Sequence, residues 1–212
     1  MNKQYLNYKH VLNHGETNSD RFDRNAFVYD NWIRKHRMGR VLDLGCGENH
    51  IKAMHGNVVG VDVIGSPDMI IDVEKNELPF EKNSFDCVVC LDFLEHVDNL
   101  HQVMNQITDI TERFIILSFP NEVNWRYVLK NLITTNDREF GFFPSNRHKW
   151  YISYSQARDF IRALCFQHSL ILLDDHIEIG TISNILNRIV RIKFPNLLPT
   201  RYYVLLKKEA QK

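Results

Sequence analysis

A short glycine turn at residues 41–49 places the strongest limit on how this chain can fold. The segment reads VLDLGCGEN, in which an apolar run leads into Gly45 and Gly47. The run predicts a buried strand, and the glycines predict a tight turn with a short helix after it. Glycine lets the backbone approach a ligand closely, and the amides at a helix start face outward, so we expect a cofactor to bind here.

Two classes of cofactor are held on turns of this kind. The dinucleotide fingerprint G-x-G-x-x-G fits poorly, because the register from Gly45 and Gly47 places His50 where the third glycine belongs. The pattern acid-x-Gly-x-Gly, which starts here at Asp43, resembles the loop of class I S-adenosylmethionine (SAM) dependent methyltransferases. That loop often carries a further glycine where this chain has Asn49, a residue that tolerates a left-handed backbone.

A second motif supports the same resemblance. Residues 78–97 read LPFEKNSFDCVVCLDFLEHV. They are similar to the LPF…SFD…LEHV segment of small-molecule class I methyltransferases, including the type 11 and ubiquinone-pathway O-methyltransferases. The resemblance covers about residues 40–120 by specific motifs and the remainder by the order of elements.

Composition limits domain number and partners. With 212 residues, 44% of them hydrophobic, the chain suits a single domain spanning 1–212. Lys plus Arg and Asp plus Glu number 26 each, so no global charge would attract nucleic acid, and we expect no such partner. The chain has no signal-peptide pattern and no run of about 18 apolar residues, which predicts a cytoplasmic protein without a transmembrane segment.

Apolar runs alternate with amphipathic segments along the chain. Residues 1–38 would form an N-terminal arm followed by a helix at 21–37, which Gly39 ends. Strands are expected at 40–44, 58–63, 68–73, 85–91, 113–119, within 168–179, and at 201–208. This alternation predicts an α/β fold with a mostly parallel sheet and helices on both faces. The resemblance implies the Rossmann-like class I methyltransferase fold, with seven strands of which the last is antiparallel.

Cys87 and Cys90 have the spacing of a zinc or redox pair. They lie inside the apolar run 85–91, however, and residues three apart on a strand point to opposite faces. We therefore interpret both as buried core thiols.

Candidate donor-site residues follow the first strands. Asp62 stands at the carboxyl end of the second strand, about twenty residues beyond the turn, where it can accept hydrogen bonds from two ribose hydroxyls. The resemblance implies the other contacts, which are Asp43, Gly45, Cys46 and Gly47 for the methionine part, Val63 beside Asp62, Asp72 and Val73 for the adenine, and Leu91 along the methyl channel. The alternative for Asp72 is a cap at a strand end.

Candidate catalytic groups follow the fourth strand. Asp92, Glu95 and His96 are spaced i, i+3 and i+4, which on a helix start would place them on one face. The pattern resembles the metal-binding segment of ubiquinone-pathway O-methyltransferases and small-RNA 2′-O-methyltransferases, and implies His148 as a fourth ligand. Such a set would suit Mg²⁺, Mn²⁺ or Zn²⁺. Relatives without a metal carry similar segments, which leaves His96 or His148 as a metal-free base or positioning group, or both as structural residues.

Residues 120–150 break the alternation and are rich in aromatic residues and arginine. We interpret them as a substrate lid, with Trp125, Arg126, Arg147 and Trp150 as substrate contacts. The alternative is a helical hairpin that covers the sheet. Aromatic rings stack on sugars and arginine binds phosphate through two hydrogen bonds, so a sugar or sugar phosphate of glycan or secondary metabolism would fit.

Residues 182–193 form a basic amphipathic pattern. Such a helix packs on the sheet in an ordinary α/β domain, or contacts a membrane surface or a partner subunit, as in a homodimer.

The sequence predicts a SAM-dependent methyltransferase that O-methylates a small molecule and releases S-adenosylhomocysteine (SAH). One alternative is a catalytically silent SAM-binding regulatory partner, although the donor residues are intact. Another is a methyltransferase that acts on protein or nucleic acid. The amino-methylation motif Asn/Asp-Pro-Pro-Tyr is missing, because residues 91–94 read LDFL.

Overall fold

The computed structural model describes residues 18–133, 148–180 and 195–209, which are built around one seven-stranded sheet of order β3-β2-β1-β4-β5-β7-β6. The strands are β1 (Val41–Leu44), β2 (Val58–Asp62), β3 (Met69–Ile70), β4 (Phe85–Leu91), β5 (Thr111–Pro120), β6 (Leu170–Ile179) and β7 (Pro199–Lys208). β7 is antiparallel to both of its neighbours, whereas β1 to β5 pair in parallel. The predicted Rossmann-like sheet with one antiparallel strand is confirmed.

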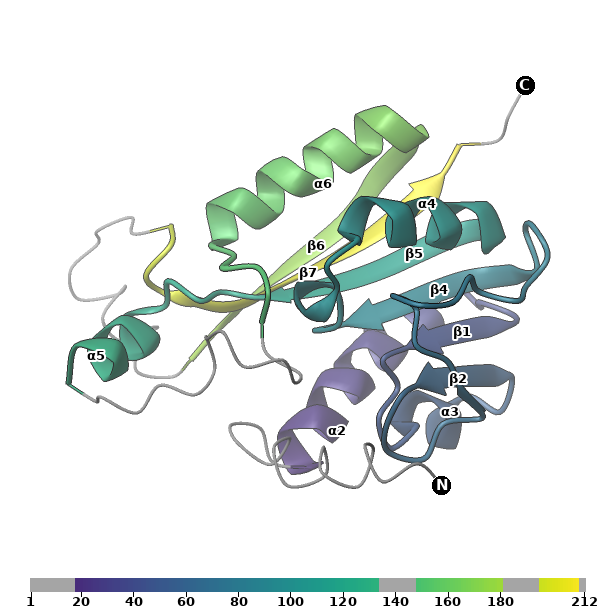
Figure 1. Ribbon diagram of the computed structural model, residues 1–212, viewed down its shortest axis with the longest axis horizontal. Coiled ribbons are helices and arrows are strands. Elements are labelled where there is room, and N and C mark those ends of the chain that lie inside the picture. The colour runs from purple at the N-terminus through teal and green to yellow at the C-terminus, as the bar shows by residue number, and fades with distance from the viewer. Residues whose placement is uncertain (1–17, 134–147, 181–194, 210–212) are drawn as a thin grey trace.

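Helices cover both faces of this sheet. The helices of the described chain are α2 (Asn18–Val28), α3 (His50–Met54), α4 (Leu100–Ile110), α5 (Trp125–Ile133) and α6 (Tyr154–His168), with a π-helical turn η1 (Tyr29–Ile33) and a 3-10 turn η2 (Leu94–His96). α5 lies beyond the edge of the sheet (Figure 1). α4 and α6 lie over one face, and α2 and α3 over the other (Figure 1). The helix expected at 21–37 therefore begins earlier and ends earlier, well before Gly39. Within the described ranges, no helix is both long and apolar enough to cross a membrane.

The two faces of the sheet bury separate hydrophobic cores. Cys87 packs in the core beneath α2 and α3, and Cys90 packs in the core beneath α4 and α6. Both are fully buried free thiols. Alternation along β4 thus separates the two side chains, and the interpretation of the pair as core residues is confirmed.

The third strand is shorter than predicted. β3 contains only Met69–Ile70, so Asp72 and Val73 lie beyond the sheet. The Asp72 carboxylate accepts a hydrogen bond from the amide of Glu74 at 3.1 Å, and its carbonyl accepts one from the amide of Asn76 at 2.9 Å. The short polar side chain of Asp72 thus stabilises a turn at a position where the sequence predicts a strand. This agrees with the alternative interpretation of Asp72 as a cap at the strand end.

Several predictions of the sequence analysis fall outside the described residues. These are the first part of the N-terminal arm (1–17), the middle of the substrate lid with Arg147 (134–147) and the basic amphipathic segment (181–194). They stay predictions.

Ser153 caps helix α6. Its hydroxyl accepts a hydrogen bond from the amide of Gln156 at 3.2 Å, and the Gln156 side chain accepts one from the amide of Ser153 at 2.9 Å. This reciprocal capping box satisfies two amides that the helix leaves without partners.

Replacing Ser153 with alanine should lower the free energy of unfolding by about 1 kcal/mol, because one amide of the first turn of α6 loses its acceptor. Urea denaturation of wild type and variant measures the change. Ser155→Ala is the matched control, since Ser155 lies inside the helix and should change stability by less than about 0.5 kcal/mol. Equal losses in the two variants would contradict the assignment of the cap.

Candidate active site

The glycine turn after β1 has the backbone that its sequence predicted. Gly45 and Gly47 have φ angles of +79° and +53°, and Asn49 has +61°. A Cβ atom at Gly45 would lie 2.7 Å from the ring of Phe93, so the residues after β4 pack directly on the turn. Side chains at these glycines would strain the backbone or displace Phe93. The expected left-handed conformation of Asn49 is confirmed.

Asp62 joins the end of β2 to this turn. One carboxylate oxygen accepts the amide of Gly47 at 2.9 Å, and the other accepts the amides of Val63 at 2.6 Å and Ile64 at 3.2 Å. Burial raises the pKa of Asp62 above its ordinary value, and the three amides oppose that rise. Asp62 therefore lies at the carboxyl edge of the sheet, where ligands bind in open α/β folds.

Asp43 is a buried carboxyl group beneath the turn. Burial raises its pKa to about 7, and the nearby charge of Arg24 opposes the rise. Among the residues described, no hydrogen-bond partner reaches its buried Oδ2 atom. Buried polar atoms in folded proteins are nearly always paired, so this atom is suited to a bound ligand or water.

Helix α2 brings two arginines to the glycine turn. The sequence analysis did not predict this contact. Arg21 Nη1 lies 3.7 Å from the position that a Cβ atom of Gly47 would occupy, and the charge of Arg24 acts on Asp43. The signal that was available is the spacing of the two arginines by three residues, which places them on one helix face.

Asp92 does not join the catalytic group that its spacing predicted. It follows β4 with a φ of +47°, ahead of the η2 turn, so the geometry of a helix start does not apply to it. Its carboxylate pairs with Arg24 at 2.8 Å and with Arg201 at 2.7 Å, and accepts the Ser118 hydroxyl at 2.6 Å. Burial favours the neutral acid, but the two guanidinium groups hold the pKa of Asp92 well below its ordinary value. The expectation of three residues on one face was wrong.

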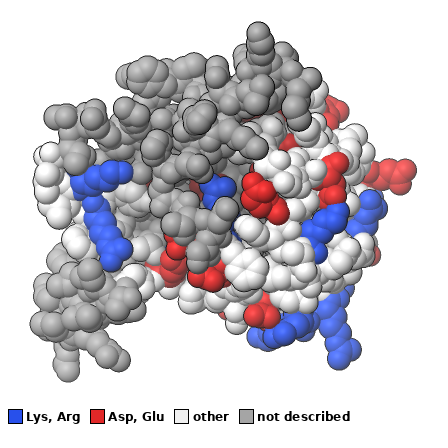
Figure 2. Space-filling view, turned by 90° about the horizontal axis from the view of Figure 1, so that it is seen from below, with Lys and Arg blue, Asp and Glu red and all other residues white. Residues whose placement is uncertain are grey.

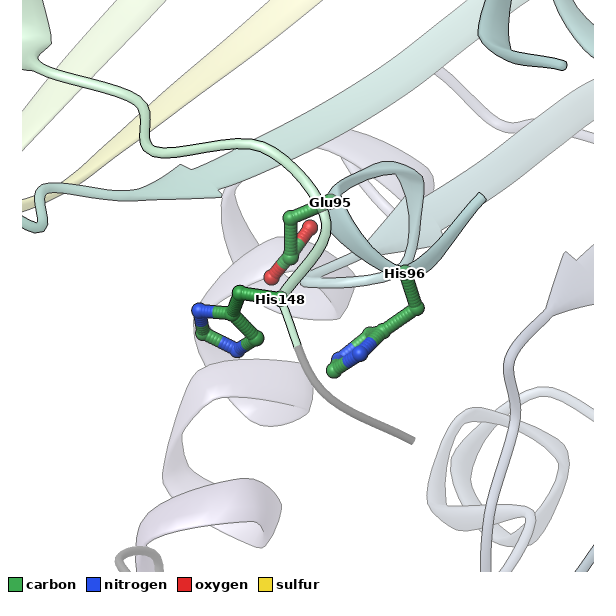
Figure 3. Close-up of side chains that lie close together, drawn as sticks. All are labelled: Glu95, His96 and His148. Carbon is green, nitrogen blue, oxygen red and sulfur yellow. The ribbon is translucent and has the colours of Figure 1, made fainter. Parts of the chain in front are cut away.

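Glu95, His96 and His148 do come together (Figure 3). One side-chain ligand atom from each lies within 4.8 Å of the others, and the two imidazole rings meet edge to face with centroids 4.7 Å apart. Glu95 is completely buried, and neither of its carboxylate oxygens has a hydrogen-bond partner in the described part of the chain. Burial and the charge of Asp92 raise the pKa of Glu95 to about 8.

Glu122 is a member of this site that the sequence analysis missed. It lies just past the carboxyl end of β5, almost fully buried, and its carboxylate forms a very short contact with Nδ1 of His148. Burial opposes protonation of His148, but the bond to Glu122 and the charge of Glu95 raise the pKa of His148 to about 9. The available signal was an acid directly after a strand of a parallel sheet.

The free energy of unfolding should fall as the pH rises from about 6.5 to about 9. The fall should be smaller in Glu122→Gln than in wild type. The pKa of His148 rises from 6.5 to about 9 on folding, so its stabilising proton is fully present below 6.5 and is lost as the pH rises through 9. Glu95 contributes in the same direction, from 4.5 through about 8. Urea midpoints at both pH values measure the effect, and an equal or larger fall in the variant would contradict it.

The other predicted contacts occupy varied environments. Cys46 and Leu91 are buried, and burial raises the pKa of the Cys46 thiol. Arg126 is exposed, with its guanidinium 5.7 Å from the ring of Trp125. Trp150 lies against η2, where its indole donates to the carbonyl of Val97 at 2.7 Å. Of the residues predicted to contact the substrate, Trp150 therefore lies beside the turn that carries His96.

Comparison with known proteins identifies the family. The profile of a family described as "Methyltransferase domain" matches residues 16–164. The ubiquinone biosynthesis O-methyltransferase of Rickettsia typhi is 25% identical over 191 residues, which cover 80% of this chain and 73% of that protein.

Solved structures share the fold at low identity. The methyltransferase domain of bacterial CtHen1 has a TM-score of 0.62 at 15% identity, covering 90% of this chain and 99% of that chain. Magnesium protoporphyrin IX methyltransferase from Synechocystis PCC 6803, solved with bound SAH, has a TM-score of 0.59 at 16% identity, covering 97% of this chain and 94% of that chain. The chain therefore belongs to the methyltransferase-domain family and is a SAM-dependent methyltransferase.

Proposed function

We propose that this enzyme transfers the methyl group of SAM to a hydroxyl group of a small molecule. The observation that carries the proposal is the cluster of Glu95, His96 and His148. Glu95 and His96 follow β4 just as the glycine turn follows β1. These two strands are parallel neighbours, so the cluster and the turn share the carboxyl edge of the sheet.

The residues at the donor turn fit SAM. Asp43 offers a buried carboxyl oxygen without a partner in the described chain, and Gly45 and Gly47 take the positive φ angles that the tight turn needs. Asp62 would hold the ribose hydroxyls, and the Asp72 turn would face the adenine. Arg21 and Arg24 supply positive charge suited to the carboxylate of the methionine part. SAM supplies a methyl group already activated by its sulfonium, so the protein mainly aligns the acceptor.

A hydroxyl acceptor must also lose its proton, and a divalent metal at the cluster is one way to promote this. Glu95, His96 and His148 fit a metal as three ligands, and Glu122 would orient the His148 ring through its contact with Nδ1. Asp92 does not fit, because arginines hold its carboxylate elsewhere.

Without a metal, His96 would take the proton. His148 would serve poorly as a base at neutral pH, because its raised pKa of about 9 keeps it protonated. A protonated His148 would instead stabilise the negative charge that develops on the acceptor oxygen.

Surface charge and the Rickettsia relative support a small-molecule acceptor. On the face drawn in Figure 2, acidic and basic side chains are interspersed, and the described residues there form no continuous basic patch. The Rickettsia relative is named an O-methyltransferase of ubiquinone biosynthesis. Trp125, Arg126 and Trp150 would suit a sugar or sugar phosphate, through stacking and charged hydrogen bonds.

Isotope tracing tests this proposal. The purified enzyme is incubated with methyl-labelled SAM and a cell extract that has been separated into small-molecule, RNA and protein fractions. We expect the label in the small-molecule fraction, on an oxygen atom. Label in the RNA or protein fraction, or on nitrogen, would overturn the proposed acceptor class.

A further inference from the structure

The segment that carries His148 is tied to the η2 turn. The amide of Lys149 donates to the carbonyl of Glu95 at 2.7 Å, and the indole of Trp150 donates to the carbonyl of Val97 at the same distance. These two bonds fix the backbone directly after His148. They therefore set where its imidazole stands against Glu95 and His96.

The Lys149 ammonium group extends this attachment to a third segment. It donates to both carboxylate oxygens of Glu74, at 2.7 and 2.8 Å, and to Asp98 at 2.6 Å. Glu74 also accepts the amide of Asp98 at 2.6 Å. The side chains of Lys149 and Glu74 are only 29% and 30% exposed, so solvent screens their pairing in part. We call this contact the Glu74–Lys149 clamp.

Glu74 belongs to the turn that Asp72 organises. The amide of Glu74 donates to the Asp72 carboxylate at 3.1 Å, and the amide of Lys75 donates to the Asp72 carbonyl, also at 3.1 Å. The residue assigned to the adenine of the donor therefore stands two positions before one end of the clamp. His148 stands one position before the other end.

We propose that the Glu74–Lys149 clamp couples the donor site to the acceptor site. The inference rests on the proposed function, because it takes Asp72 as a donor contact and His148 as an acceptor contact. Lys149 is a positioning residue, which acts through the place of His148. A donor that fixes the Asp72 turn also fixes Glu74, and this restrains Lys149 and the backbone beside the histidine cluster. Chains of hydrogen bonds and ion pairs can carry such coupling, and these contacts form one between the Asp72 turn and the histidine cluster.

A purely structural role would look different. Partly exposed ion pairs contribute little to stability on their own, and their contribution does not depend on a ligand elsewhere. The distinguishing property is therefore a change at Lys149 and Trp150 that follows donor binding. The amide of Lys149 and the indole N–H of Trp150 are natural reporters, since the first donates to η2 and the second to Val97 directly after it.

Hydrogen exchange of the full chain, followed by NMR with and without SAH, tests the inference. In wild type, SAH should slow exchange at both reporters by about fivefold or more, with the amide of Asn83 as the reference. About fivefold is the lower end of the usual coupling between two binding sites. In Glu74→Gln, which loses the charge that pairs with Lys149, the slowing should be less than about twofold. Lys149→Arg should retain the effect at Trp150. Lys82→Ala, which breaks an exposed pair with Asp109, is the matched control and should retain it fully.

The outcomes separate this inference from the proposed function. No SAH binding by wild type would overturn the donor site, and with it the proposed function. SAH binding without slower exchange at Lys149 and Trp150 would overturn the coupling alone. The coupling would also be overturned if SAH slowed exchange in Glu74→Gln as much as in wild type, provided that the variant is folded and binds SAH.

Discussion

Asp62→Ala should weaken SAH binding by about 100-fold or more. A carboxylate that accepts bonds from two ribose hydroxyls contributes about 1.5–3 kcal/mol for each bond, and about 2.7 kcal/mol corresponds to 100-fold in Kd. The same side chain holds the amide of Gly47, so its loss also loosens the turn on which the donor would bind. Isothermal titration of both proteins with SAH measures the change.

Glu48→Gln is the matched control for this experiment. Glu48 lies in the same loop, but its carboxylate forms an exposed hydrogen bond with the Ser66 hydroxyl at 3.0 Å. Its replacement should change the Kd for SAH by less than about threefold, as is usual for an exposed site. Retention of tight binding by Asp62→Ala would mean that the ribose is held elsewhere.

The geometry of the glycine turn was predictable because its information is local. Gly45 and Gly47 follow β1, Asp62 ends the adjacent parallel strand β2, and strand ends of a parallel sheet meet at one edge whatever the rest of the chain does. Asp72 was harder, because apolar residues ahead of it predict a strand and its own side chain ends that strand in a turn. Propensity and turn chemistry compete there, and the turn prevailed.

The surroundings of the histidine cluster depend on contacts between distant segments. Asp92 lies 68 positions from Arg24 and 109 from Arg201, and no local pattern shows that these arginines hold it. Its spacing from Glu95 suggested a shared helix face, but the chain becomes helical only after Phe93. Glu122 was missed for a related reason, since its importance comes from a contact with His148, 26 positions away.

His148→Ala should lower kcat for methyl transfer by about 100-fold to 1,000-fold, while the Kd for SAH stays within about twofold of wild type. His148 is the residue through which Glu122 acts on the cluster, and its imidazole lies against both Glu95 and His96. Its loss removes either a metal ligand or the cation that stabilises the acceptor oxygen. The measurement uses the small-molecule fraction that accepts label, with SAH titrated separately.

Glu122→Gln and a chelator then identify what His148 does. Losing an outer partner of a metal ligand typically costs about 10-fold to 100-fold in activity, so Glu122→Gln should fall between wild type and His148→Ala. If a metal is involved, chelation should abolish transfer, and Mg²⁺, Mn²⁺ or Zn²⁺ should restore it in wild type but not in His148→Ala. If His96 acts as a free base, the chelator should have no effect.

His101→Ala is the control variant. His101 is an exposed histidine on α4, and its replacement should leave activity as in wild type. Full activity in His148→Ala would exclude both roles and leave this histidine as a structural partner of Glu122.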